Sequence, residues 1–157
     1  MYHSIIFGEK NTWDDWHLIP SSRPVFATPS VRTNYVEVPG ADGALDLTEA
    51  LVNRPLYNNR EGNFEFIVYN DIGTYADDKT WSEIYSEIAA YIHGKKMNSI
   101  LEDDPGYYYH GRFFLDEWKS DPNYSTISIS YVVDPYKYEK TQSYDPYSKP
   151  ANPGGIL

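Results

Sequence analysis

The run Val38-Pro-Gly-Ala-Asp-Gly-Ala-Leu-Asp-Leu47 constrains the local fold more than any other part of the sequence. Pro39 cannot donate a hydrogen bond within a strand ladder, and Gly40 and Gly43 tolerate positive φ angles, so we expect the chain to reverse direction here. Leu45 and Leu47 follow at the two-residue spacing of a strand. No side chain in the run is a nucleophile or could form a metal cage. The run therefore predicts a hairpin with a structural role rather than a chemical one.

Length and cysteine content bound the fold class. The chain has 157 residues and no cysteine. This length suits one domain that buries roughly two thirds of its unfolded surface. Without cysteine, disulfide bonds and thiolate zinc sites are impossible, which fits synthesis in a reducing cytoplasm. The first seven residues have no basic region, and no apolar run approaches the ~20 residues of a membrane span, so we expect neither a cleaved signal nor insertion in a bilayer.

The charge and the aromatic content of the chain point to protein contacts rather than nucleic-acid recognition. A formal net charge of -10 disfavours binding to phosphate backbones, which depends mainly on lysine and arginine. The charge either keeps the chain soluble or lines a passage through which DNA slides without sticking. With 16 tyrosines and 4 tryptophans, the chain has more large rings than one small core can use, so we expect several at protein interfaces.

Alternating apolar residues predict a mainly β fold. The clearest run covers residues 124–133, with apolar positions expected to face inward and hydroxyl positions to face water: Ile127, Ile129, Tyr131 and Val133 against Thr126, Ser128 and Ser130. Further strands are predicted over residues 2–7, 13–18, 31–38, 63–69, 99–102 and 107–114, with Phe64, Phe66 and Val68 alternating in the fourth of these. Residues 46–51 fit either a short helix or a continued strand.

One amphipathic helix is predicted, from Thr80 to His93. Thr80 and Glu83 have the spacing of a capping box, Asp77 and Asp78 favour the positive end of the helix dipole, and Gly94 ends the helix. Its apolar stripe consists of Trp81, Ile84, Tyr85, Ile88, Ala89 and Ile92. Docking of this stripe gains roughly 10 kcal/mol before the entropy of ordering is subtracted, so the helix depends on a sheet to pack against.

Residues that commonly perform chemistry are scattered. The histidines have no close pair at metal-ligand spacing, so we expect no metal site: His3, His17, His93 and His110. Several aspartates fit turn chemistry better than a calcium loop: Asp42, Asp46, Asp103 and Asp104. Arg112 is expected to have a structural role, such as pairing with a carboxylate across the sheet, or to lie at an interface.

Enzyme motifs are missing from the sequence. It has no nucleophile elbow, phosphate-binding glycine loop or dinucleotide fingerprint, so we expect no enzyme activity and no cofactor. A glycosidase needs two carboxylates beside an aromatic cleft, and an acidic β-rich chain always offers nominal candidates. Here these are Asp14, Asp15, Glu37, Glu65 and Asp116.

Several short motifs follow one another along the chain, after a proline-rich segment over residues 19–30. The motifs are Val38–Leu47, the Tyr57-Asn-Asn-Arg60 step into the strand at 64–68, the helix end Ile92-His-Gly-Lys95, Asp104-Pro-Gly-Tyr-Tyr-Tyr-His-Gly-Arg112 and Val133-Asp-Pro-Tyr-Lys-Tyr138. Their order resembles the distal tail (Dit) proteins of long-tailed bacteriophages, and the resemblance spans about residues 26–138.

This resemblance implies an antiparallel β-sandwich with one helix. Six copies would form a ring that connects the tail tube to the baseplate or tail tip and lets DNA pass through its centre. It implies a virion protein, made in the host cytoplasm, whose partners are the tail tube, the tape measure and a tail-associated lysin or receptor-binding protein. Larger members add a C-terminal domain, and we expect this chain to supply the hub alone. The family has no catalytic residues to carry over.

The predicted organisation is one ring-forming domain over residues 1–138 and a Tyr/Pro/Gly-rich tail over 139–157, either extended or held at an interface. The turn and the tail supply the interface candidates, namely Pro39, Gly40, Asp42, Gly43, Leu45, Tyr144 and Tyr147. A carbohydrate-binding sandwich is the alternative, because sugars stack on exposed aromatic rings. Its candidate rings are Trp13, Trp16, Trp118 and Tyr107 to Tyr109.

Overall fold

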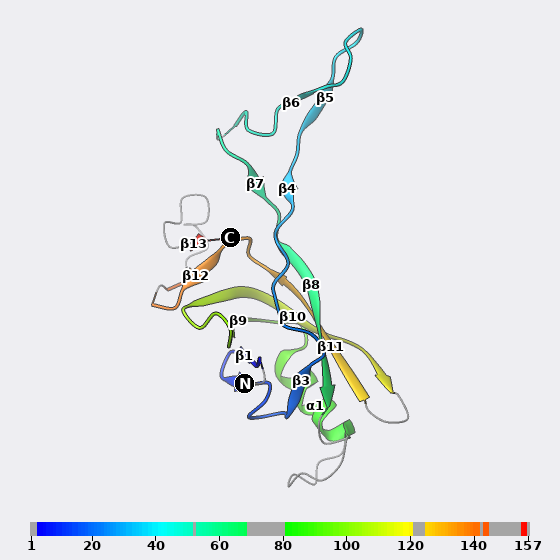
Figure 1. Ribbon diagram of the computed structural model, residues 1–157, viewed down its shortest axis with the longest axis vertical. Coiled ribbons are helices and arrows are strands. Elements are labelled where there is room, and N and C mark those ends of the chain that lie inside the picture. The colour runs from blue at the N-terminus through cyan, green and yellow to red at the C-terminus, as the bar shows by residue number, and fades with distance from the viewer. Residues whose placement is uncertain are drawn as a thin grey trace.

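Antiparallel strands make up most of the regular secondary structure among the described residues. Figure 1 shows a computed structural model, which describes residues 3–51, 53–68, 81–120, 125–141, 143–144 and 155–156, with the backbone alone at 81, 117–120 and 155–156. A single helix among these residues packs on the strands. The main sheet curls back on itself and gives the two facing layers of a β-sandwich, so the predicted fold class is confirmed. The described part holds no helix long and apolar enough to cross a membrane.

A nine-stranded sheet forms the body. Its main path runs β2-β1-β9-β10-β11-β8-β3, and β12 and β13 continue from β10. The strands are β1 (Ile5–Phe7), β2 (Lys10–Asn11), β3 (Leu18–Pro20), β8 (Arg60–Val68), β9 (Lys95–Leu101), β10 (Tyr107–Ser120), β11 (Ser125–Val133), β12 (Lys137–Glu139) and β13 (Gly155–Ile156).

The N-terminal segment supplies both edges of the main path. β1 and β2 form one edge and β3 forms the other. The backbone N–H of Leu18 donates to the carbonyl of Thr12 at 2.8 Å, which links the two edges. The curled sheet is therefore nearly closed on itself.

The segment between these edges is a turn, so the strand predicted over residues 13–18 is wrong. The Asn11 Oδ1 atom accepts from the backbone N–H of Trp13 at 2.8 Å and of Asp14 at 3.2 Å, and the Asp15 N–H donates to the Asn11 carbonyl at 3.0 Å. Such local bonds compete with a strand ladder. The turn carries Trp16 into the core, where it is buried.

Alternate residues of the central strands fill the core, largely as predicted. The expected inward residues of β11 and β8 are all buried: Ile127, Ile129, Tyr131, Val133, Phe64, Phe66 and Val68. Thr126 was expected to face water but is buried, because β11 is a central strand and Thr126 lies between Ile67 of β8 and Lys119 of β10. Phe26, from the proline-rich segment, closes the core by stacking on Tyr109 with ring centroids 4.0 Å apart.

The helix α1 (Trp81–Ile92) packs against β10 through the buried residues Ile84, Ile88 and Ile92. Gly94 follows it with φ of 73°, and its N–H donates to the carbonyl of Phe113 at 2.8 Å. The predicted helix and its stop are thus confirmed, while the cap at Thr80 and the upstream aspartates lie outside the described residues. The Arg112 Nη1 atom donates to the Gly94 carbonyl rather than to a carboxylate, and the cross-strand neighbours of Arg112 are Lys96 and Val132.

Candidate functional site

A long arm projects from one end of the curled sheet (Figure 1). It consists of two successive ribbons. At its stem β4 (Val31–Arg32) pairs with β7 (Leu56–Tyr57), and toward its tip β5 (Tyr35–Glu37) pairs with β6 (Ala44–Asp46). All residues from 31 to 46 are exposed. The arm therefore has little packing of its own and presents its side chains to the surroundings.

The tip of the arm is the turn predicted from the sequence. The register pairs Glu37 with Ala44, and the Ala41 N–H donates to the Val38 carbonyl at 3.1 Å. Gly40 and Gly43 have φ angles of 82° and 73°, which residues with a Cβ atom rarely adopt. The chain reversal is confirmed. It gathers five of the predicted interface residues at one exposed place: Pro39, Gly40, Asp42, Gly43 and Leu45.

The ribbon at the tip has two unlike faces. Val36 and Leu45 are direct cross-strand partners, and strand alternation puts Val38 and Leu47 on the same side. The opposite face carries the other members of the two strands, namely Tyr35, Glu37, Ala44 and Asp46. One face is thus apolar and the other is mostly polar and acidic. A two-stranded ribbon has no second layer, so nothing within the ribbon covers the apolar face.

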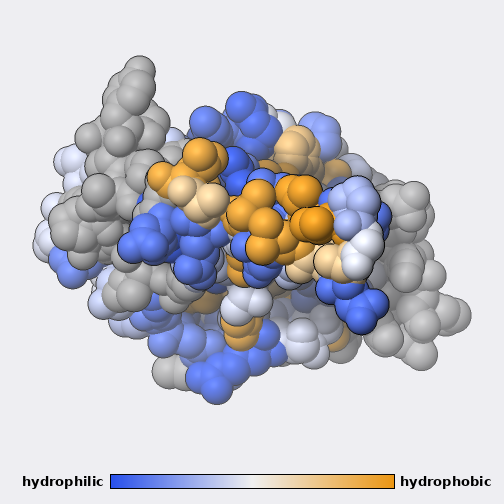
Figure 2. All heavy atoms as spheres, turned by 90° about the horizontal axis from the view of Figure 1, so that it is seen from above, coloured by the Kyte–Doolittle hydropathy of each residue, from blue (hydrophilic) through white to orange (hydrophobic). Residues whose placement is uncertain are grey.

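Most of the exposed large apolar side chains of the described residues lie on the arm. They are Val31, Tyr35, Val36, Val38, Leu45 and Leu51, while Val25 lies just before it. Figure 2 looks down onto the arm and shows apolar residues gathered in the centre of this view. A patch of this kind, surrounded by polar residues, is typical of an interaction surface.

The chain returns from the tip through a hydrogen-bonded turn. β6 ends at Asp46, whose Oδ1 atom accepts from the backbone N–H of Thr48 at 2.9 Å and also from its hydroxyl group. These bonds lower the pKa of the Asp46 carboxyl from its usual value. The Asn53 N–H then donates to the Glu49 carbonyl at 2.9 Å. Residues 46–51 are therefore neither the helix nor the long strand that the sequence left open.

The arm is fixed to the body by a buried arginine. The Arg60 Nε atom donates to the carbonyl of Pro135 at 3.0 Å, and its guanidinium carbon lies 5.4 Å from the ring centroid of Tyr109. Arg60 is the first residue of β8 and directly follows the stem. Burial lowers the pKa of this guanidinium from its usual value. In the sequence, Arg60 stands out only as the last residue of the motif Tyr57-Asn-Asn-Arg60.

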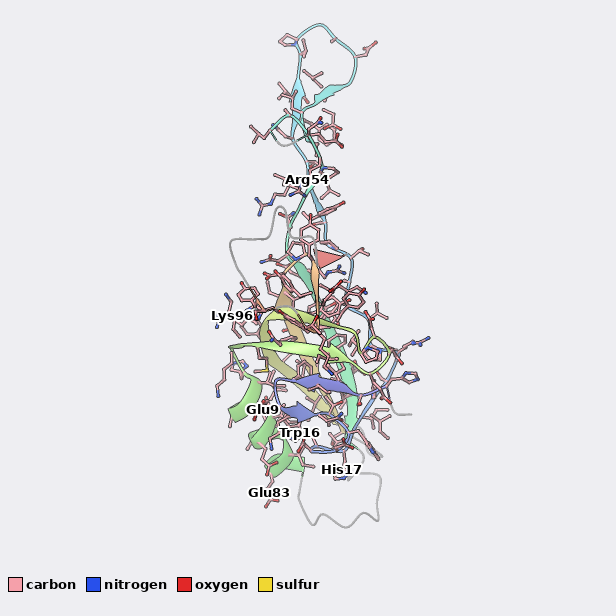
Figure 3. The ribbon with its side chains drawn as sticks, turned by 90° about the vertical axis from the view of Figure 1, so that its left-hand side faces the viewer. Glu9, Trp16, His17, Arg54, Glu83 and Lys96 are labelled. Atoms are coloured by element: carbon pink, nitrogen blue, oxygen red, sulfur yellow. The ribbon has the colours of Figure 1, made fainter. Side chains whose placement is uncertain are left out.

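A hollow of about 320 Å³ lies beside the stem. Its wall includes Arg32, Arg54, Leu56, Tyr57 and Tyr136. Figure 3 shows Arg54 on the stem, between the tip of the arm and the main sheet. This hollow was not predicted from the sequence. A signal was available, because Arg32 and Arg54 are the cations within the otherwise acidic stretch from residue 31 to 57.

The predicted interface residues of the tail are placed only in part. Tyr144 stacks on His110 with ring centroids 3.7 Å apart and meets Tyr138 edge-on at 5.8 Å. Tyr144 is half-buried, and its partner Tyr138 belongs to β12, which lies far from the tip of the arm (Figure 1). The structure therefore does not bring the two groups of candidates together. Tyr147 lies outside the described residues.

The aromatic rings that suggested sugar binding, Tyr107 included, are buried or half-buried wherever the structure describes them. Trp16, Tyr108 and Tyr109 are buried, and Trp13 is half-buried against His17, with ring centroids 5.5 Å apart. The side chain of Trp118 lies outside the described part. A stacking platform for a sugar needs exposed ring faces. Searched over the described residues alone, the structure holds no cluster of three or more potential metal ligands.

The fold of this chain is similar to that of one solved phage protein. Its structure is similar to the crystal structure of the SPP1 Dit protein (gp 19.1), described as a paradigm of the hub adsorption apparatus in phages that infect Gram-positive bacteria. The TM-score is 0.59 at 16% sequence identity, and the match covers 88% of this chain and 53% of that chain. This chain thus spans about half the length of that protein. No protein-family model and no curated protein matches the sequence.

Proposed function

We propose that this chain is a structural subunit of a phage tail, with no catalytic role. Six copies would form a ring that connects the tail tube to the baseplate or tail tip. Its arm carries the proposal, because it presents an apolar ribbon face that no second layer of the ribbon covers. The likeness of its fold to a phage hub protein supports the same role.

A repeated contact through the arm would close a ring. The arm and any surface that receives it differ from each other, so the contact is heterologous, and heterologous contacts close into rings when the rotation between copies allows it. Burial of the side chains of Val36, Val38 and Leu45 would contribute a few kcal/mol for each contact, by the usual ~25 cal/mol per Å². In a ring of six, these contributions act together.

The remaining parts of the proposal follow from the ring. Residues 1–138 would be the ring-forming domain and residues 139–157 a tail held at an interface, with Tyr144 as one contact. The adjoining proteins would be the tail tube, the tape measure and a lysin or receptor-binding protein, all in the virion. A net charge of -10 would keep DNA from sticking as it passes through the centre.

The oligomeric state tests this function. The purified protein, alone and mixed with the tail proteins encoded beside it, would be examined by sedimentation velocity and negative-stain microscopy. We expect a ring with six-fold symmetry in one of the two preparations. A strictly monomeric protein in both preparations, at high concentration, would contradict the proposal. Calorimetry against host wall polysaccharides, which we expect to be flat, checks the carbohydrate-binding alternative.

A further inference from the structure

Charge is segregated along the arm. Within residues 31–57, every carboxylate lies closer to the tip of the arm than the two cations do. The carboxylates are Glu37, Asp42, Asp46 and Glu49. Arg32 and Arg54 lie on the stem. Two arms that met tip to tip would bring like charges together, whereas the tip of one arm on the stem of another would bring opposite charges together. The charge pattern thus favours a tip-to-stem contact.

The hollow beside the stem combines positive charge with apolar walls. The Arg54 Nη1 atom donates to the hydroxyl of Tyr136 at 2.9 Å, and the rings of Tyr57 and Tyr136 meet edge-on at 6.1 Å. The Arg32 Nε atom donates to the Asn58 Oδ1 atom at 3.1 Å, and no carboxylate of the described residues forms a salt bridge with Arg32. Such a site suits a carboxylate that is attached to an apolar segment.

The tip of the arm offers such a carboxylate beside apolar residues. Asp42 is exposed, and no described residue forms a salt bridge with its carboxylate, whereas the Asp46 carboxylate is held by Thr48. Val38 and Leu45 flank the turn with 46% and 53% of their surface exposed. The turn of the same chain lies at the far end of the arm from the hollow, so it cannot fill it (Figure 1).

We propose that the hollow lined by Arg32, Arg54 and Tyr136 is the receptor for the turn of a second copy of this chain. The Asp42 carboxylate of one copy binds the Arg32 guanidinium of the next, whose Arg54 stays hydrogen-bonded to Tyr136, and the apolar residues beside the turn pack on Leu56 and Tyr57. This inference rests on the proposed ring and specifies the contact that closes it.

A charge swap tests the contact. Arg32→Glu and Asp42→Arg each place like charges at the proposed contact, so each variant alone is expected to weaken self-association by about tenfold or more. An equimolar mixture of the two variants is expected to restore assembly as a ring in which the two variants alternate. At every second contact of that ring, the parent Asp42 of one variant meets the parent Arg32 of the other. At the remaining contacts both residues are substituted, so their charges are exchanged but still opposite. The double variant is expected to assemble because each of its contacts joins opposite charges. The matched control for Asp42→Arg is Asp14→Arg, which makes the same change in net charge at an exposed residue of the body.

The outcomes separate this inference from the proposed function. Both substituted residues are exposed, so circular dichroism and thermal unfolding are expected to match the parent protein. If Leu45→Asp abolishes assembly while the charge variants assemble normally, the receptor is wrong and the ring stands. If the single variants fail and neither the mixture nor the double variant recovers, the pairing of Asp42 with Arg32 is wrong. If the parent protein never assembles, both proposals fall.

Discussion

The Nη1 atom of Arg60 donates a hydrogen bond to the backbone carbonyl of Ala27 at 3.1 Å, across the point where the chain leaves the body for the arm. The N–H of Ala27 in turn donates to the hydroxyl of Tyr131 at 2.7 Å. Both backbone groups of Ala27 are therefore held by side chains of the sheet. Because Arg60 itself lies where the chain returns from the arm, these bonds fix the departing and the returning strand together.

Replacement of this arginine by lysine is expected to destabilise the protein. Arg60→Lys keeps the positive charge but loses the fork that reaches Ala27 and Pro135 together. We expect a loss of about 2–3 kcal/mol in the free energy of unfolding, measured by urea denaturation. The matched control is Arg23→Lys at an exposed position, which is expected to change the free energy of unfolding by less than ~0.5 kcal/mol. Equal effects of the two changes would show that the buried fork contributes nothing.

Gly62 is expected to tolerate no side chain. A Cβ atom at this position would lie 2.5 Å from the hydroxyl oxygen of Tyr131, which holds Ala27. Gly62→Ala is therefore expected to cost about 1–3 kcal/mol in the free energy of unfolding. Gly106→Ala is the control, since nothing lies within 4 Å of a Cβ atom there.

A double variant identifies the cause of that cost. Tyr131→Phe removes the nearer of the two Tyr131 atoms that the added methyl group would meet within 3.0 Å, while the ring carbon Cζ at 2.8 Å remains. The combination of Gly62→Ala with Tyr131→Phe is therefore expected to cost less than the sum of the two single changes. Strict additivity in urea denaturation would contradict a clash with the hydroxyl oxygen.

The stability of the protein is expected to fall at alkaline pH. Burial raises the pKa of Tyr108, Tyr109, Tyr131 and Tyr138 above their usual values, with the largest rise at Tyr138. Below about pH 10 these hydroxyls are protonated in the folded and the unfolded chain alike, so stability does not change. Above about pH 10 the unfolded chain releases their protons first, and each such tyrosine lowers the free energy of unfolding by up to ~1.4 kcal/mol per pH unit.

Urea denaturation between about pH 9 and about pH 11 measures this loss. Tyr138→Phe is expected to make the decline less steep by roughly one proton. Tyr35→Phe, on the exposed ribbon, serves as the control and is expected to leave the slope as in the parent protein. A slope that is the same in all three proteins would show that Tyr138 does not contribute.

The apolar side chains of the arm are expected to contribute to assembly but not to folding. Leu45→Ser, at a residue with 53% of its surface exposed, is expected to change the free energy of unfolding of the monomer by less than ~0.5 kcal/mol. Ile129→Ser, at a fully buried residue, is expected to cost about 3 kcal/mol or more. Thermal unfolding measures both. A large loss in Leu45→Ser would mean that the arm packs on its own body.

Local patterns in the sequence were sufficient to predict the elements that depend on local physics. The alternation of Ile127, Ile129, Tyr131 and Val133 predicted a buried strand face, and the glycines at 40 and 43 predicted a reversal, because periodicity and φ preferences act over a few residues. The helix stripe was predicted for the same reason. The interface role of Tyr144 and of the turn residues stays a prediction.

The features that the sequence did not predict depend on contacts between distant residues. The bonds from Arg60 to Ala27 and Pro135 join segments far apart in the chain, and neither partner carries a distinctive pattern. The turn at residues 12–16 was mistaken for a strand because side-chain hydrogen bonds from Asn11, rather than periodicity, decide its shape. The hollow at Arg32 and Arg54 requires the pairing of β4 with β7, which two-residue strands do not reveal.

Closure of the curled sheet by its own N-terminal segment has a consequence for many copies crowded together. The edge strands of its main path, β2 and β3, are two and three residues long, and β3 ends at Pro20, which has no N–H to offer. These edge strands are thus too short to pair with the edge strands of neighbouring molecules, and such pairing would be needed for open-ended growth into fibres. In the proposed ring, contacts would then be left to the arm, whose geometry rather than the supply of protein would determine how many copies join.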